Sequence, residues 1–262
     1  VVFRLKERVG TKHILNSYVG ELDVRRLGLV AWLPVLILFD FAAAFPSVAH
    51  SWLFTVPKGM KLWSGFLRAI KRLYKGNKTY INAGGLMAFM FDISAGILQG
   101  CPLSGTLFVF VIDPILWMCR KQIDSAVIRA CADDIGVAIR RLEHLLLFHK
   151  IFDDFKKVSG LTLKPAKCVS VMTVCEHDSV SVEAIRSWLA ENIPEWALMK
   201  LQTSAKYLGL FLGPSAGAMQ WTKPIAKFLS RTKEINVAKL PMAVAIRRFN
   251  FKAAPVLGYI AQ

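Results

Sequence analysis

Apolar positions along this chain recur with two different periods, which predict a mixture of strands and helices. A nearly continuous apolar run predicts a buried strand at 31–41. Helical spacing at 61–74 places Leu62, Phe66 and Ile70 on one face. Further helices are expected at 104–122, 143–158, 182–192 and 222–254, the last interrupted by Pro241. Hairpins are expected at 78–93 and 127–139, and single strands at 161–163, 168–174 and 206–212. This pattern predicts an α+β fold, a sheet covered by helices on one side.

Carboxylates follow or interrupt two of the predicted strands. Asp40 directly follows an apolar run, and Asp133 and Asp134 stand at the turn of the hairpin predicted at 127–139. Taken singly, such residues are ordinary turn or N-cap residues. Burying like charges together is costly unless a cation neutralises them, and Mg²⁺ favours carboxylate oxygens. Three carboxylates on neighbouring strand ends can hold two metals for phosphoryl transfer.

A third motif lies between the two acidic sites, and the ordered set resembles the reverse transcriptase family. Residues 39–48 (FDFAAAFPSV), 94–108 (SAGILQGCPLSGTLF) and 132–134 (ADD) are similar to motifs A, B and C of that family, in the same order. Residues 155–168 and 206–213 look like motifs D and E, and 248–259 looks like the start of the thumb. The likeness is greatest to the enzymes of non-LTR retrotransposons.

The resemblance implies a polymerase right-hand palm, an antiparallel sheet backed by helices, with partial fingers and the start of a helical thumb. Residues 1–30 are then expected to be a fingers remnant and 214–262 the thumb start. Residues 31–213 would form the palm, with a fingers-side insertion near 60–93. Because only 39 residues precede Asp40, we expect a piece of a longer reading frame that lacks most of the fingers and is inefficient alone.

The resemblance also implies RNA-directed DNA polymerase activity on a primer 3′-hydroxyl. Asp40 and Asp133 would be the main ligands of two Mg²⁺ ions, with Asp134 assisting and Mn²⁺ as a substitute metal. Lys167 matches the motif D lysine, proposed in the family as a proton donor to pyrophosphate. Lys164 lies close enough to confuse that assignment, and an exposed surface lysine is an equally weighted alternative.

Nucleotide binding is implied for Phe41, Phe45, Gln99 and Gly100. Phe45 matches the aromatic that stacks under the incoming sugar and excludes a 2′-hydroxyl, whereas residue chemistry alone favours a core Phe. Gln99 and Gly100 precede a helix with Ser104 as its expected N-cap, and the plain alternative is an ordinary loop.

The primer grip is implied at Tyr207, Leu208 and Gly209, for which a plain β-hairpin is the alternative. Three positions depart from the usual family pattern. Ala43 stands where Lys is frequent, Pro46 where Asp is frequent, and Cys131 where Tyr or Phe is usual. None of these changes removes a metal ligand. They nevertheless keep a second hypothesis open, a catalytically inactive relic that still binds nucleic acid.

Charge points to polyanionic partners. The chain carries 34 Lys and Arg against 18 acids in 262 residues, a formal charge of +16, with basic stretches at 58–78, 150–167 and 223–252. Such a surface suits nucleic acid, and the resemblance implies an RNA template, a DNA primer and dNTPs. An anionic membrane surface would also fit the charge. The oligomeric state stays open.

Hydropathy and cysteines bear on the compartment. The mean hydropathy of +0.42 keeps membrane association as a third hypothesis. However, the uncharged stretch 94–112 contains Gln99, Pro102 and several glycines, so no stable membrane insertion is expected. The five cysteines lack metal-site spacing and are expected to be reduced thiols. With no visible signal peptide, we expect an intracellular, non-secreted protein, and the resemblance implies the nucleus.

Overall fold

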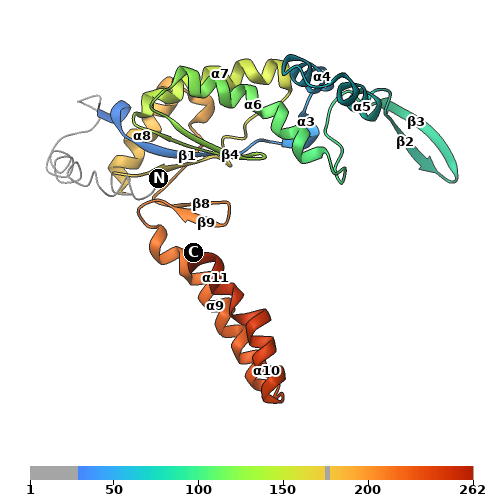
Figure 1. Ribbon diagram of the computed structural model, residues 1–262. Helices are drawn as coiled ribbons and strands as arrows, with labels where there is room; N and C mark the ends of the chain where they lie inside the picture. The colour runs from blue at the N-terminus through green and yellow to red at the C-terminus, as the bar shows by residue number, and fades with distance from the viewer. Residues whose placement is uncertain (1–28, 175–177, 262) are drawn as a thin grey trace.

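A five-stranded sheet forms the centre of the computed structural model, which describes residues 29–174 and 178–261 (Figure 1). In spatial order the strands are β4 (Val127–Cys131), β5 (Asp134–Ile139), β1 (Val35–Phe39), β6 (Val169–Met172) and β7 (Lys200–Gln202). All neighbours are antiparallel except β6 and β7. The strand expected at 31–41 is therefore confirmed in a shorter form, because Leu29–Trp32 forms the 3₁₀ helix η1.

Helices cover one face of this sheet. They include α6 (Ser104–Gln122), η2 (Leu142–His144), α7 (Leu145–Ser159), α8 (Ser179–Asn192) and η3 (Pro194–Trp196). The Phe39 ring lies 4.9 Å from that of Phe152 and 5.5 Å from that of Trp196, between centroids. Fully burying one such side chain stabilises the fold by about 1.5–3 kcal/mol, so this aromatic cluster fixes the end of β1.

Three helices and a hairpin connect β1 to α6. They are α3 (Ala44–Ser47), α4 (His50–Gly59), α5 (Ser64–Tyr74), β2 (Lys78–Ala83) and β3 (Leu86–Asp92). The hairpin projects from the body (Figure 1). Its turn has positive φ at Gly84 and Gly85, as expected for glycines in a two-residue hairpin turn. The helix expected at 61–74 begins only at Ser64, because Lys61 adopts a left-handed conformation with φ of 56°.

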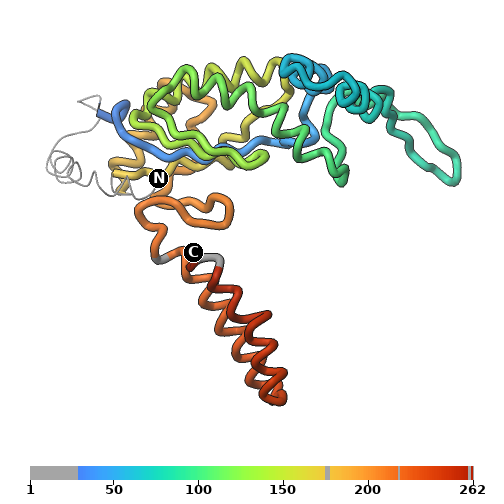
Figure 2. The backbone as a smooth tube through the Cα atoms, viewed as in Figure 1, coloured from blue at the N-terminus to red at the C-terminus, as the bar shows by residue number. Residues whose placement is uncertain are grey.

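The C-terminal part leaves the sheet as a helical rod (Figure 2). A small hairpin of β8 (Ala205–Tyr207) and β9 (Leu210–Leu212) leads into α9 (Ala216–Val237). The rod continues through α10 (Met242–Arg248), the π-helical segment η4 (Phe249–Ala253) and α11 (Pro255–Ala261). The helical break at Pro241 is confirmed.

Two expectations about the elements are wrong, and two elements of the structure were not expected. Residues 206–212 form two strands rather than one, because Leu208 and Gly209 have φ of 47° and 90° and make a turn. Of 161–163, only Leu163 pairs, in an isolated bridge to Phe41. α4 and β7 were not expected. Pro57 inside α4 conceals its helical pattern, and β7 has only three residues.

Two further expectations concern the ends of the chain and membranes. The fingers remnant expected at 1–30 lies almost entirely outside the described residues. Across the ranges that are described, no helix combines the length and apolarity needed to cross a bilayer.

Candidate active site

The sheet brings the three predicted carboxylates together. Phe39 pairs with Ile135, so Asp40 and Asp134 are the next positions along two adjacent antiparallel strands. Asp133 stands beside them in the tight turn between β4 and β5, where Ala132 has a left-handed φ of 52°. Partial burial raises the pKa of Asp134, and the charges of Asp133 and Asp40 raise it further. The three acids therefore form one electrostatically coupled group.

The loop after α7 holds the backbone of Asp40 from the other side. The Lys164 N–H donates to the Asp40 carbonyl at 2.9 Å. The Asp40 N–H donates to the buried Cys168 sulfur at 3.3 Å. The Ala42 N–H donates to the Thr162 carbonyl at 2.8 Å. The main chain of Asp40 is thereby fixed, while its carboxylate keeps 44% of its exposure for a ligand.

Only one of the two candidate lysines reaches the acids with its side chain. The Lys167 ammonium lies 3.7 Å from the Asp40 carboxylate, whereas Lys164 is exposed and contacts Asp40 through its backbone N–H. Both members of the Lys167–Asp40 pair are about half exposed, so the pair contributes little to stability. Its geometry favours Lys167 over Lys164 for the predicted role, which stays a prediction.

The three acids have the donor chemistry of a divalent-metal site, but they do not form a preassembled one. In the ranges that the structure describes, no three Asp, Glu, His or Cys side chains stand ready-made around one metal position. Nevertheless, carboxylate oxygens are hard donors that suit Mg²⁺. Burial and then the charges of Asp133 and Asp40 raise the pKa of Asp134, and a bound cation would offset both effects. The residues present therefore fit a divalent metal.

The predicted nucleotide-binding residues divide into two groups. Phe45 is half-buried and stacks on Phe108, with centroids 4.5 Å apart, and its carbonyl accepts from the Ile97 N–H at 2.8 Å. This bond ties the loop carrying Gln99 and Gly100 to the segment after Asp40, and both loop residues are exposed. Both residues are therefore accessible to a ligand.

Phe41 behaves differently from the other candidates. Its side chain is only 4% exposed and its ring packs near that of Phe152. A contact between Phe41 and a nucleotide would therefore have to come from the backbone. The expected N-cap role of Ser104 is wrong, because Leu103 occupies that position. The Ser104 hydroxyl instead donates back to the Leu98 carbonyl.

Tyr207 of the predicted primer grip contacts the acidic hairpin directly. The Tyr207 hydroxyl donates to the Asp134 carbonyl at 3.4 Å. Its ring covers Gly136 so closely that a Cβ there would lie 3.3 Å from it. Burial raises the pKa of Tyr207, and the Asp134 charge raises it further. Leu208 and Gly209 form the adjacent turn. The sequence did not indicate the roles of Gly136 and Cys168, because these roles depend on contacts between segments far apart in the chain.

Comparison with protein families decides the assignment. The family model described as reverse transcriptase (RNA-dependent DNA polymerase) matches residues 30–212. The chain belongs to the reverse transcriptase family. The match covers the sheet, the acids and the β8–β9 hairpin, and so confirms the resemblance based on the ordered motifs.

Individual relatives agree with this reverse transcriptase assignment. The Pol polyprotein from the type-2 retrotransposable element R2DM of Drosophila melanogaster is 27% identical over 215 residues, covering 76% of this chain and 18% of that protein. A 149 kDa protein of transposon TX1 from Xenopus laevis is 28% identical over 130 residues, covering 46% and 10% respectively. The chain thus spans less than a fifth of these relatives, which support a domain of the non-LTR type.

Solved structures bear on the fold alone. Apo telomerase from Candida tropicalis superposes with a TM-score of 0.51 at 11% identity, covering 90% of this chain and 44% of that one. Its form truncated from the C-terminal domain gives a TM-score of 0.50 at 11% identity, covering 81% and 38%. The predicted α+β, polymerase-like fold is confirmed.

Proposed function

We propose that this reverse transcriptase domain is the RNA-directed DNA polymerase of a non-LTR retroelement. The observation that carries the proposal is the convergence of Asp40, Asp133 and Asp134 at adjoining strand ends, beside Lys167. The partners would be an RNA template, a DNA primer and dNTPs. The site of action would be the nucleus, as expected for such elements.

Each part of the chain then has a proposed place in the polymerase. Residues 31–213 would be the palm, with the segment near 60–93 on the fingers side. Residues 214–262 would begin the thumb. The exposed Gln99–Gly100 loop and Phe45 would position the incoming nucleotide. Tyr207, Leu208 and Gly209 would hold the primer end, because Tyr207 contacts the Asp134 strand and the other two form the turn next to it.

Asp40 and Asp133 would be the main ligands of two Mg²⁺ ions, with Asp134 assisting and Mn²⁺ able to substitute. When bound, such metals activate the primer 3′-hydroxyl and neutralise charge on the leaving pyrophosphate. The hydrogen bonds to the Asp40 backbone would hold its carboxylate in place to bind them. Lys167 would deliver a proton to the leaving group, since its ammonium already lies beside Asp40.

Primer extension tests the proposal. The protein is incubated with an RNA template, a DNA primer, dNTPs and Mg²⁺, as the 262-residue chain and as its full reading frame. Asp133→Asn should abolish extension, whereas Asp153→Asn should not, because Asp153 is an exposed acid on α7. Retained RNA binding without extension by either form would instead favour the inactive relic. Extension that survives Asp133→Asn would exclude the proposed metal site.

A further inference from the structure

A long segment of the chain carries only positive charge. Residues 41–91 contain seven Lys and Arg and no Asp or Glu. Four of these cations lie on or directly after α5 at helical spacing, Arg68, Lys71, Arg72 and Lys75, and all four are exposed. Within the described residues no ion pair holds them. Like charges at such spacing destabilise a helix. An anionic ligand bound along this stripe would relieve the repulsion.

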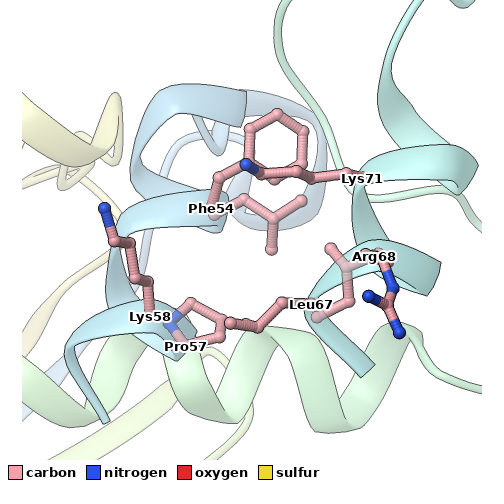
Figure 3. A pocket seen from close by; sticks show the side chains of 8 residues that line it. Phe54, Pro57, Lys58, Leu67, Arg68 and Lys71 are labelled. Atoms are coloured by element: carbon pink, nitrogen blue, oxygen red, sulfur yellow. The ribbon is translucent and has the colours of Figure 1, made fainter. Parts of the chain in front are cut away.

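The stripe borders a small apolar pocket between α4 and α5 (Figure 3). Its volume is about 90 Å³. The apolar lining includes Phe54, Pro57 and Leu67, and the cations at its edge are Lys58, Arg68 and Lys71. This space suits one flat ring or one side chain, with positive charge on several sides of it.

The pocket belongs to a different side of the molecule from the primer-grip hairpin. α4 packs against α6 and α7 in the helical layer, whereas Tyr207 packs on Gly136 and β8–β9 lies across the sheet from that layer (Figure 1). A ligand bound between α4 and α5 would therefore lie on the other side of the sheet from the primer-grip hairpin.

We propose that this α4–α5 face binds single-stranded nucleic acid, as a site separate from the polymerase site. The stripe on α5 would follow successive phosphates, and the pocket would receive one base against Phe54. Cations beside aromatic and apolar surfaces bind single strands in this way without reading their sequence. A single strand is favoured over a duplex because its bases are free to enter a pocket.

The extent of the stripe favours a polynucleotide over an acidic peptide. A peptide with one apolar anchor would fill the pocket and need only the three cations at its edge. However, Arg72 and Lys75 continue the positive charge for a further helical turn beyond it. A continuous polyanion uses all of these positions, because each neutralised phosphate releases condensed counterions.

Salt-dependent binding of labelled decamers tests the site. Fluorescence anisotropy with rU₁₀ and dT₁₀ is measured on the full chain in EDTA, without dNTPs, so the result does not depend on polymerase activity. The test variant is Lys58→Gln/Arg68→Gln/Lys71→Gln. The matched control, Arg120→Gln/Lys150→Gln/Lys156→Gln, removes the same charge from exposed positions elsewhere.

We expect the test variant to weaken binding about tenfold and to flatten the slope of log K against log salt by about 2, since each lost contact to a single strand contributes about 0.7. The control should change neither quantity appreciably. Equal effects of both variants would overturn the site, because then only net charge matters. Tighter binding of rU₁₀ than dT₁₀ would add recognition of the 2′-hydroxyl, whereas equal binding would assign the site to phosphates and bases alone.

A second variant tests the pocket without changing charge. Leu67→Trp should fill it, abolish photocrosslinking of a 4-thiouridine decamer to residues 54–71, and leave the salt slope unchanged. Crosslinks that persist in Leu67→Trp would refute base insertion. The charge variant is also tested against a labelled glutamate-rich peptide bearing one leucine. If it loses binding to this peptide but binds the oligonucleotides as well as the parent chain does, the face would be reassigned to a protein partner.

Discussion

Gly160 offers a stability test in which the structure supplies its own control. The residue ends α7 with φ of 79°, and a Cβ placed on it would lie 2.3 Å from the Ser47 carbonyl oxygen. Real Cβ atoms do not approach backbone so closely, and this oxygen cannot rotate away as a side chain would. Gly160→Ala must therefore shift either the end of α7 or α3. Both lie next to the hydrogen bond from the Ala49 N–H to the Ser159 carbonyl.

The expected cost has two parts. Forcing Ala into the left-handed region costs about 1–2 kcal/mol, and overpacking a tight site costs about 1–3 kcal/mol more. Gly160→Ala should therefore lower the free energy of unfolding by roughly 2–5 kcal/mol. Gly76 also has φ of 79°, but a Cβ there would meet nothing within 4 Å. Gly76→Ala should therefore cost only the first part.

Urea unfolding followed by circular dichroism measures both variants against the parent chain. The difference between them isolates the clash with Ser47 from the backbone penalty. Equal destabilisation by the two substitutions would refute the reasoning, since it would mean that α3 and α7 yield without cost. A drop in the m-value of Gly160→Ala alone would show a looser native or denatured state rather than a changed contact.

Three further predictions concern the acids and their surroundings. Because burial and the neighbouring charges of Asp133 and Asp40 raise the pKa of Asp134, ionising it opposes folding. Metal-free stability should fall as pH rises from the ordinary value of 3.8 through the raised one, and Asp134→Asn should flatten this dependence in thermal melts. Mg²⁺ should raise the Tm of the parent chain but not of Asp133→Asn; equal shifts would place the metal elsewhere. Burial raises the pKa of Cys168 to about 11, so iodoacetamide should label the exposed Cys131 in the folded chain and leave Cys168 unreacted, as peptide mapping would show.

Local sequence patterns predicted the elements that carry their own periodicity. The buried strand before Asp40, the hairpin at Gly84–Gly85 and the helix at 104–122 are confirmed because each is encoded within its own residues. The adjacency of Asp40 to Asp133 and Asp134 was also predictable, since all three stand at strand ends. The roles of the individual site residues stay predictions.

Contacts between distant segments were not predictable from those patterns. The sulfur of Cys168 reads as an ordinary buried thiol in sequence, yet it accepts a hydrogen bond from Asp40, 128 positions away. The contact of Tyr207 with Gly136 likewise depends on how β8–β9 lies across the sheet. Ser104 was misassigned because an N-cap and a hydroxyl that folds back on the preceding loop share the same local sequence.

The position of β1 between β5 and β6 has a consequence for how the protein is made. The strand is uncharged, apolar and rich in β-forming residues, a composition typical of aggregation-prone segments. Its nearest sheet partner begins only at Asp134. At the usual rate of about 5–20 residues per second, a ribosome needs roughly 5–20 s to supply that partner. During that interval β1 has no hydrogen-bonding neighbour, so we expect nascent chains to depend on chaperones at this stage.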